Sequence, residues 1–250
     1  MITEAKQVMI FISQIKNVRP YDQRCSYPHN IPSVVALKEL EFHKPVTFII
    51  GENGSGKSTL IEAIAINAGF NPEGGGRNFS FNTNESHSEL FQDIRLIRTA
   101  YRNKDGFFLR AESFYNVASE VDKLYASEKS ELEQSYGGSL HARSHGESFL
   151  ALLHNRLIGH GLYIFDEPES ALSIISQFNM LTRLKQLVDK KSQFIIATHS
   201  PVLMAYPDAD IYCVSENGLQ LVNYEDTEQY KLTKYFMNNY QKMLGELGLL

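Results

Sequence analysis

Nine consecutive residues, Gly51–Thr59, have the types and spacing of a loop that binds phosphate groups. Their sequence, Gly-Glu-Asn-Gly-Ser-Gly-Lys-Ser-Thr, fits the pattern G-x-x-x-x-G-K-[ST]. Glycines let the backbone approach phosphate oxygens closely, and the N–H groups of such a loop form a concave set of donors. We therefore predict that a polyphosphate is bound by Gly51, Glu52, Asn53, Gly54, Ser55, Gly56, Lys57, Ser58 and Thr59.

Two side chains of this loop predict chemistry beyond binding. The Lys57 ammonium group would reach the β- and γ-phosphates, and the Ser58 hydroxyl would ligate Mg²⁺. The alternative is a chance glycine turn, but the flanking residues favour the phosphate loop. Val46–Ile50 is a short apolar run typical of a buried strand, and apolar residues at helical spacing follow from Leu60.

A second apolar strand ends in two carboxylates, Asp166 and Glu167. Beside a phosphate loop, Asp166 is predicted to hold Mg²⁺ directly or through water. Glu167 would lie beyond the γ-phosphate, where it can act as the general base for an attacking water. The alternative is a strand capped by solvated acids.

The run Gln193–Ala197 predicts a further buried strand, which leads through Thr198 to His199. A lone histidine is usually structural. At the end of a sheet strand beside a nucleotide, however, its imidazole can hydrogen-bond the γ-phosphate or the attacking water. We therefore predict that His199 joins Lys57 and Glu167 as a catalytic residue.

Other elements are expected to position these residues. A polar, glycine-containing loop, 137–148, opens an apolar helix and offers unpaired N–H groups to an anion, a weak signal by itself. The remaining expectations are strands at 8–15 and 33–37, a hairpin of 93–102 with 107–112, a helix over 114–132, a helix through 174–184, a hairpin over 210–222, and a helix capped by Asp226 that ends near 247.

The composition is ordinary for a globular protein, and it limits the function classes. A net charge of −5 gives no overall basic footprint for nucleic acid. No apolar run is long enough to cross a bilayer, and Met1–Lys6 lacks the form of a signal peptide. The two cysteines have no metal-type spacing, nor do the histidines at 141, 145, 154 and 160. A cytoplasmic protein is expected.

Taken together, the order of these motifs resembles the ABC-type ATPases over residues 8–222. Gly51–Thr59 resembles Walker A, Leu162–Glu167 resembles Walker B, Ser170–Ser173 the D-loop, and His199 the switch histidine. Arg143–Glu147 resembles the signature loop, in place of the usual Leu-Ser-Gly-Gly-Gln. The motifs are most similar to the soluble RecF/SMC/OLD-like branch, and within it to small stand-alone bacterial predicted ATPases.

This resemblance implies an α/β P-loop NTPase fold of the ABC type, with a mixed central sheet, an antiparallel β subdomain and a short helical lobe. It also implies a single domain over residues 1–250, in which about 77–145 form a hairpin and helical lobe inserted between Walker A and the signature.

The implied mechanism is Mg²⁺-dependent ATP hydrolysis by a head-to-tail homodimer that holds two ATP molecules between its protomers. Ser144, Gly146 and Glu147 would face the nucleotide bound to the partner. The chain departs from the family pattern at two places, both of which affect the coupling between a partner and hydrolysis. His145 replaces the first glycine of the signature loop. No clear Q-loop glutamine is present, and Glu112 or Asn116 is expected at its position.

Three functions remain open at this point. The first is a soluble ATPase switch that acts on an unidentified partner protein or nucleic acid. The second is the nucleotide-binding subunit of a transporter, which the altered signature disfavours. The third is a nucleotide-gated module of a defence or toxin–antitoxin system with little turnover, and the presence of Glu167 and His199 favours turnover over this reading.

Overall fold

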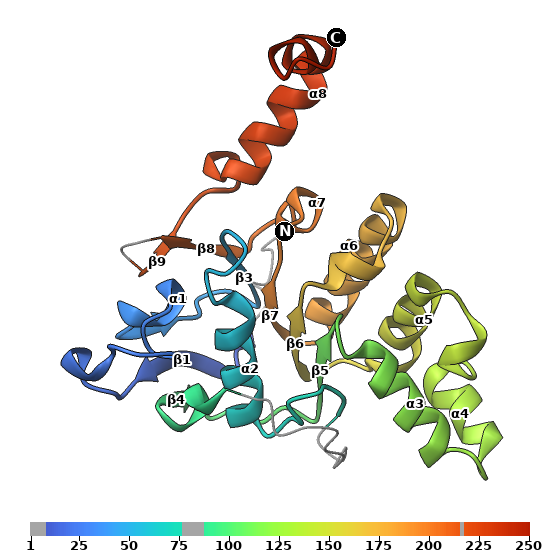
Figure 1. The fold of residues 1–250 in the computed structure, drawn as a ribbon. Coiled ribbons are helices and arrows are strands. Elements are labelled where there is room, and N and C mark those ends of the chain that lie inside the picture. The colour runs from blue at the N-terminus through green and yellow to red at the C-terminus, as the bar shows by residue number, and fades with distance from the viewer. Residues whose placement is uncertain (1–8, 77–87, 216–217) are drawn as a thin grey trace, which may run out of the picture.

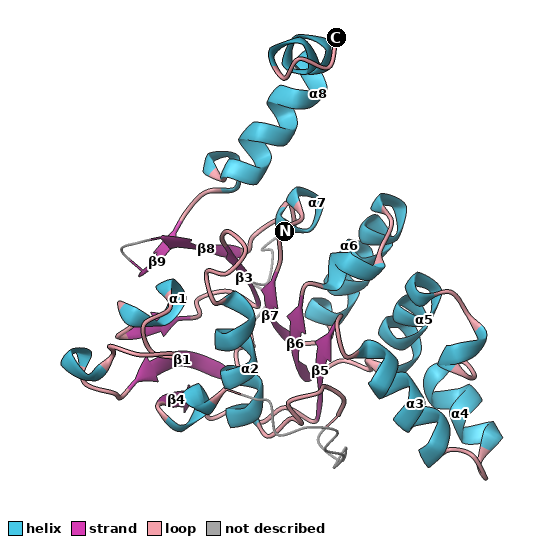
Figure 2. Cartoon of the chain, viewed as in Figure 1, coloured by secondary structure: helices cyan, strands magenta, loops and turns pink. Residues whose placement is uncertain are grey.

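A computed structural model describes residues 9–76, 88–215 and 218–250. Strands form the centre of the molecule, a lobe of helices lies at one side, and the last helix projects away from the body (Figure 1). Figure 2, coloured by secondary structure, shows the strands at the centre with helices around them.

The described residues include a six-stranded sheet in the order β5-β6-β7-β3-β8-β9. Its pairs are parallel except for β8 with β9, so the sheet is mixed, as the resemblance to ABC-type ATPases implied. The strands are β3 (Val46–Ile50), β5 (Asp105–Arg110), β6 (Gly161–Asp166), β7 (Gln193–Ala197), β8 (Asp210–Ser215) and β9 (Gly218–Leu221).

A second, three-stranded sheet in the described residues has the order β2-β1-β4 and is antiparallel throughout. Its strands are β1 (Ile12–Asn17), β2 (Glu39–Glu41) and β4 (Ile94–Arg98). Buried side chains of this sheet, among them Ile15 and Leu40, pack in one cluster with Ile61 of the helix that follows the phosphate loop. The antiparallel β subdomain predicted from the sequence is therefore present.

The core lies on both faces of the central sheet, because neighbouring side chains of a strand point to opposite faces. Phe48 of β3 packs in a cluster with Leu184, whereas Ile49 packs in a second cluster with Leu60.

The helices are α1 (Pro32–Val35), α2 (Lys57–Ala68), α3 (Phe114–Leu124), α4 (Lys129–Tyr136), α5 (His145–Ala151), α6 (Ile174–Asp189), α7 (Pro201–Met204) and α8 (Glu228–Glu246).

The expected hairpin of 93–102 with 107–112 is wrong. β4 pairs with β1 in the small sheet, whereas β5 pairs in parallel with β6 in the large one. The physical reason is burial: Phe107 lies in the core on one face of β5 and Phe108 in the core on the other, so the strand needs cover on both sides.

The expected strand at 33–37 is also wrong, because this segment contains the short helix α1. Pro32 lies in its first turn, where the fixed φ of proline favours a helix. The Ser33 N–H donates to the Ser55 carbonyl at 3.0 Å, and its hydroxyl donates to the Gly56 carbonyl at 2.9 Å. These tertiary bonds tie α1 to the phosphate loop and override the strand preference of the two valines.

Other elements begin or end at residues that differ from those expected from the sequence, without a change in the architecture. The first strand begins at Ile12 rather than at Val8, which lies outside the described residues. The helix expected over 114–132 is two helices, with a turn between Leu124 and Lys129. Thr227, not Asp226, caps α8, because its hydroxyl accepts the Tyr230 N–H. Residues 77–87 of the expected insertion and residues 216–217 of the expected hairpin turn also lie outside the described part.

Helix α8 projects from the body (Figure 1), and none of its residues, all of which the structure describes, is buried. Among the described residues, no helix is long and apolar enough to cross a membrane.

Candidate functional site

The carboxyl ends of three neighbouring strands gather the predicted site residues. In the register of the sheet, Ala197 of β7 pairs with Asp166 of β6 on one side and with Ile49 of β3 on the other. The Glu167 N–H donates to the Ala197 carbonyl at 3.0 Å. The phosphate loop, the two carboxylates and His199 therefore follow adjacent strands at one edge of the sheet.

The phosphate loop takes a backbone conformation that requires glycine at its last turn. Gly56 has φ 88°, and a Cβ there would lie 2.5 Å from Ile31 Cδ1 and 2.6 Å from Ser33 Oγ. Gly56 is also the N-cap of α2, and no side chain among the described residues caps this terminus. The first N–H groups and the positive dipole end of α2 thus face the loop, an arrangement that suits a phosphate.

Lys57 begins α2 and bends back over the loop. Its side chain is buried, and Nζ donates to the Gly51 carbonyl at 3.0 Å and to the Glu52 carbonyl at 2.9 Å. Burial lowers the pKa of Lys57, while the carboxylates of Glu167 and Asp166 oppose that shift. The ammonium group is held at the loop by two neutral acceptors, which phosphate oxygens can replace.

Ser58 and Asp166 form the predicted magnesium pair. The Ser58 hydroxyl donates to Asp166 Oδ1 at 3.0 Å, and Asp166 is only 4% exposed. Burial raises the pKa of Asp166 to about 6. No group of three or more His, Cys, Asp or Glu side chains in the described ranges could hold a metal. Two oxygen ligands fit Mg²⁺, which is commonly bound by one or two protein groups together with substrate phosphates.

Glu167 follows Asp166 with a change of backbone direction. It has φ 49° and ψ 51°, in the left-handed region that glycine favours, and its side chain is 39% exposed. After this turn the Glu167 side chain is partly exposed, whereas the Asp166 side chain stays buried. Glu167 Oε1 lies 3.4 Å from His199 Nε2. Backbone strain of this kind is often found at functional sites.

His199 has a second acidic neighbour that the sequence did not single out. Its backbone N–H donates to Glu169 Oε1 at 2.5 Å. Glu169 therefore fixes the backbone of the segment that carries the imidazole. The signal in the sequence is the acid two residues after Glu167, in the run Asp-Glu-Pro-Glu over residues 166–169.

The signature loop stays accessible at the surface. Ser144, His145 and Glu147 are exposed, and Gly146 is half-buried. Ser144 caps α5, because its hydroxyl oxygen accepts the Glu147 N–H at 3.4 Å. In return, the Ser144 N–H and hydroxyl donate to Glu147 Oε2 at 2.9 and 2.6 Å. Gly146 lies against the D-loop, because a Cβ there would be 2.8 Å from the Ala171 carbonyl. Within one protomer, Ser144 and Glu147 thus bond to each other.

A cavity of about 190 Å³ opens beside the magnesium pair. It is lined by Ser58, Arg110, Ala111, Glu112, His145, Asp166, Glu167 and Ser170. Of the two candidates for the Q-loop position, Glu112 lines this cavity, whereas the Asn116 amide donates to Glu73 Oε2 at 3.3 Å. His145 faces the cavity of its own protomer.

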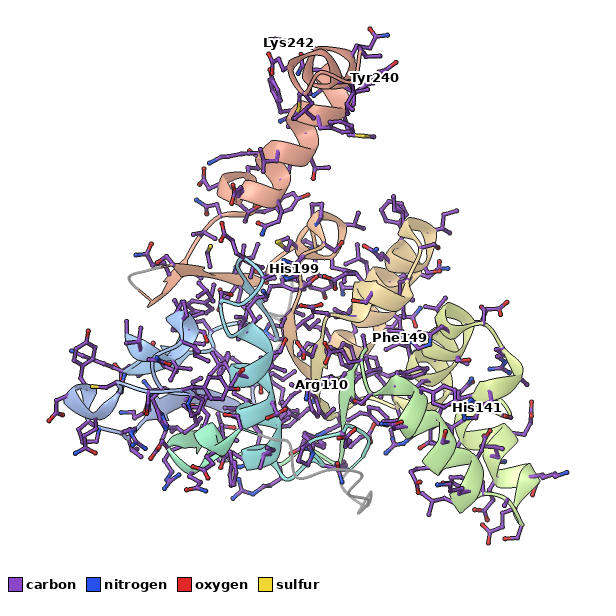
Figure 3. The ribbon with its side chains drawn as sticks, viewed as in Figure 1. Arg110, His141, Phe149, His199, Tyr240 and Lys242 are labelled. Atoms are coloured by element: carbon purple, nitrogen blue, oxygen red, sulfur yellow. The ribbon has the colours of Figure 1, made fainter. Side chains whose placement is uncertain are left out.

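Arg110 is the functional candidate that sequence reasoning missed. It ends β5, where its register partner is Asp166, and it lies between α2 and the helical lobe (Figure 3). Arg110 Nη1 bonds Glu62 Oε2 at 2.6 Å, and its Nε lies 3.6 Å from Asp166 Oδ2. The alternation of residues 107–112 indicated that Arg110 is a polar position. The expected hairpin placed this strand beside 93–102, so it did not predict that Arg110 lies next to Asp166.

Comparison with known proteins agrees with this architecture. The family described as "AAA domain" matches residues 14–234. The solved structure of cbiO1 from Clostridium perfringens, "part of the ABC transporter complex cbiONQ", is 16% identical, with 96% of this chain and 99% of that chain covered and a TM-score of 0.50. The SMC head domain from Thermotoga maritima is 16% identical, with 85% and 98% covered and a TM-score of 0.44. Comparison with curated proteins finds no match.

Proposed function

The chain belongs to the AAA domain family and has the fold of an ABC-type P-loop ATPase; on that premise we propose that it binds ATP with Mg²⁺ and hydrolyses it. One observation carries this proposal. The Ser58–Asp166 hydrogen bond joins the phosphate loop to the acidic end of β6, with Glu167 and His199 at the same edge of the sheet.

Binding would rest on the phosphate loop and the N-terminus of α2. Lys57, now bonded to the Gly51 and Glu52 carbonyls, would donate to the β- and γ-phosphates. Ser58 and Asp166 would hold Mg²⁺, which supplies neutralisation of the phosphate charge when it is bound. The backbone N–H groups of the loop add fixed dipoles that need no rearrangement during the reaction.

Hydrolysis would depend on Glu167 and His199. The Glu167 carboxylate is half-exposed at the cavity and would take the proton from an attacking water. His199, 3.4 Å from Glu167, would hold that carboxylate in place or donate to the γ-phosphate. The Glu169 carboxylate would help to hold His199 near Glu167, because it accepts the His199 backbone N–H.

We further propose that ATP joins two protomers head to tail. Ser144, Gly146 and Glu147 of one protomer would complete the nucleotide site of the other, and Ser144 and Glu147 are exposed at the surface where a second protomer could reach them. Loss of the γ-phosphate would weaken the interface, so hydrolysis would act as a switch on a partner protein or nucleic acid.

A steady-state ATPase assay on the wild type and Glu167→Gln tests the proposal. Replacement of a general base is expected to lower turnover about 10²–10⁴-fold. The affinity for ATP should stay within a fewfold, because Glu167 lies outside the phosphate loop. Glu246→Gln on the exposed helix α8 is the matched control. A wild type without Mg²⁺-dependent turnover, or a Glu167→Gln variant as active as the wild type, would overturn it.

A further inference from the structure

Arg110 lies among acidic side chains at the magnesium pair. Its guanidinium group is 2.6 Å from Glu62, 3.6 Å from Asp166 and 3.8 Å from Glu112. The Glu62 and Asp166 side chains are almost completely buried, so the positive charge of Arg110 offsets two carboxylates that have little contact with water.

The two oxygens of Asp166 face different partners. Oδ1 accepts the hydrogen bond from Ser58, and Oδ2 faces Arg110 Nε. Arg110 Nε is buried and has no hydrogen-bond partner among the described residues. The distance of 3.6 Å exceeds that of a hydrogen bond, so a small movement of the Asp166 carboxylate would complete one.

Arg110 is itself anchored, because Glu62 holds it in place. Glu62 Oε2 binds Arg110 Nη1, and Glu62 Oε1 accepts the Ser88 N–H at 3.0 Å. Glu62 lies on α2, whose first turn carries Ser58. One helix therefore supplies the predicted metal ligand Ser58 and also the carboxylate that fixes Arg110 beside the second ligand.

We propose that Arg110 is a positioning residue for the magnesium ligand Asp166, an inference that rests on the proposed function. The guanidinium group keeps Oδ2 turned toward β5 and leaves Oδ1 directed to Ser58 and the metal. Side chains that orient metal ligands in this way commonly contribute 10–100-fold to metal affinity. The charge-assisted bond to Glu62 keeps Arg110 at Asp166, which disfavours a direct role at the triphosphate.

Binding of Mn²⁺, a paramagnetic substitute for Mg²⁺, tests this role without turnover. Electron paramagnetic resonance would measure the affinity for Mn²⁺ in the presence of a non-hydrolysable ATP analogue. Affinity for the same analogue in EDTA would be measured separately. Arg110→Ala is expected to weaken Mn²⁺ binding about 10-fold or more, with analogue binding in EDTA unchanged within twofold.

Two further variants separate positioning from folding. Arg110→Ala leaves Glu62 buried without its cation, so the double variant Arg110→Ala/Glu62→Gln removes that charge as well. It should fold and show the same loss of Mn²⁺ affinity. Arg110→Lys keeps the charge without the planar fork and should restore part of the affinity. Arg102→Ala, an exposed arginine, is the control and should match the wild type.

The outcomes distinguish this inference from the function on which it rests. Folded Arg110 variants that bind Mn²⁺ as tightly as the wild type, or more tightly, would overturn the positioning role. Loss of analogue binding in EDTA would also overturn it, because Arg110 would then act on the phosphates. A wild type that binds neither the analogue nor Mn²⁺ would contradict the proposed function itself and remove the inference with it.

Discussion

Ser58 and Asp166 are 108 positions apart in the sequence, yet the Ser58 hydroxyl donates a 3.0 Å hydrogen bond to the Asp166 carboxylate. This bond connects the first turn of α2, which follows β3 and the phosphate loop, with the end of β6, although β7 lies between β3 and β6 in the sheet. Both predicted magnesium ligands are thus in place beside each other, and the account of the site depends on this contact.

Replacement of Lys57 by alanine should abolish nucleotide binding. Lys57 contributes a positive charge at the phosphate loop, where its ammonium group already donates to the Gly51 and Glu52 carbonyls. We expect the dissociation constant for ATP, measured by isothermal titration calorimetry, to rise at least about 100-fold, because a charge-assisted bond to phosphate is lost. Lys185→Ala, an exposed lysine on α6, should bind like the wild type. Unchanged affinity of Lys57→Ala would remove the assignment of the phosphate loop.

Local patterns were sufficient to predict most of the candidate site. The phosphate loop, the two carboxylates and His199 each follow a short apolar strand, and a parallel sheet places the ends of such strands at one edge. Their order along the chain is what resembles the ABC-type ATPases. These predictions depend on the residues next to each motif, whose apolar runs indicate the strands and helices.

The neighbours of the site depend on strand order, which local patterns do not determine. Asn103–Gly106 read as a hairpin turn, so β5 was expected beside β4. The burial of Phe107 and Phe108 on opposite faces instead places β5 beside β6, and that register brings Arg110 to Asp166. The helix α1 was missed for the same kind of reason, because its bonds to Ser55 and Gly56 are tertiary.

Asp166→Asn should change the pH dependence of stability in the metal-free protein. Burial raises the pKa of Asp166 from 3.8 to about 6. The folded state therefore binds this proton more tightly than the unfolded state. The contribution of the protonated Asp166 carboxyl to the free energy of unfolding is full below pH 3.8 and is lost as the pH rises through about 6.

Urea denaturation in EDTA from pH 4 to pH 8 measures this effect. The wild type should lose stability relative to Asp166→Asn across the window between pH 3.8 and about 6, and the difference should level off above it. Curves for the two proteins that stay parallel over the whole range would show that the carboxyl is not perturbed by burial.

His199→Ala should reduce turnover without a comparable effect on ATP binding. The imidazole lies 3.4 Å from Glu167 and is absent from the phosphate loop, so it acts on the reaction rather than on affinity. We expect kcat to fall about 100-fold, the usual cost of one donor at a site of developing charge. The exposed His154 provides the matched variant, His154→Ala. Equal loss of kcat in both variants, or no loss in His199→Ala, would contradict the assigned role.

The proposed head-to-tail contact depends on the exposed signature loop. In the Glu167→Gln background, where ATP persists, Ser144→Arg should prevent dimer formation because its bulk and charge would lie at the interface. ATP binding to the same double variant should remain, since Ser144 lies outside the phosphate loop of its own protomer. Loss of ATP binding together with the dimer would place Ser144 in the site of its own chain.

Size-exclusion chromatography with light scattering on Glu167→Gln, with and without ATP and Mg²⁺, tests the central claim most directly. One chain has a mass of 28.4 kDa. The account predicts that mass without nucleotide and twice that mass with ATP and Mg²⁺. A variant that binds ATP at saturation and still elutes with the mass of a single chain would contradict it.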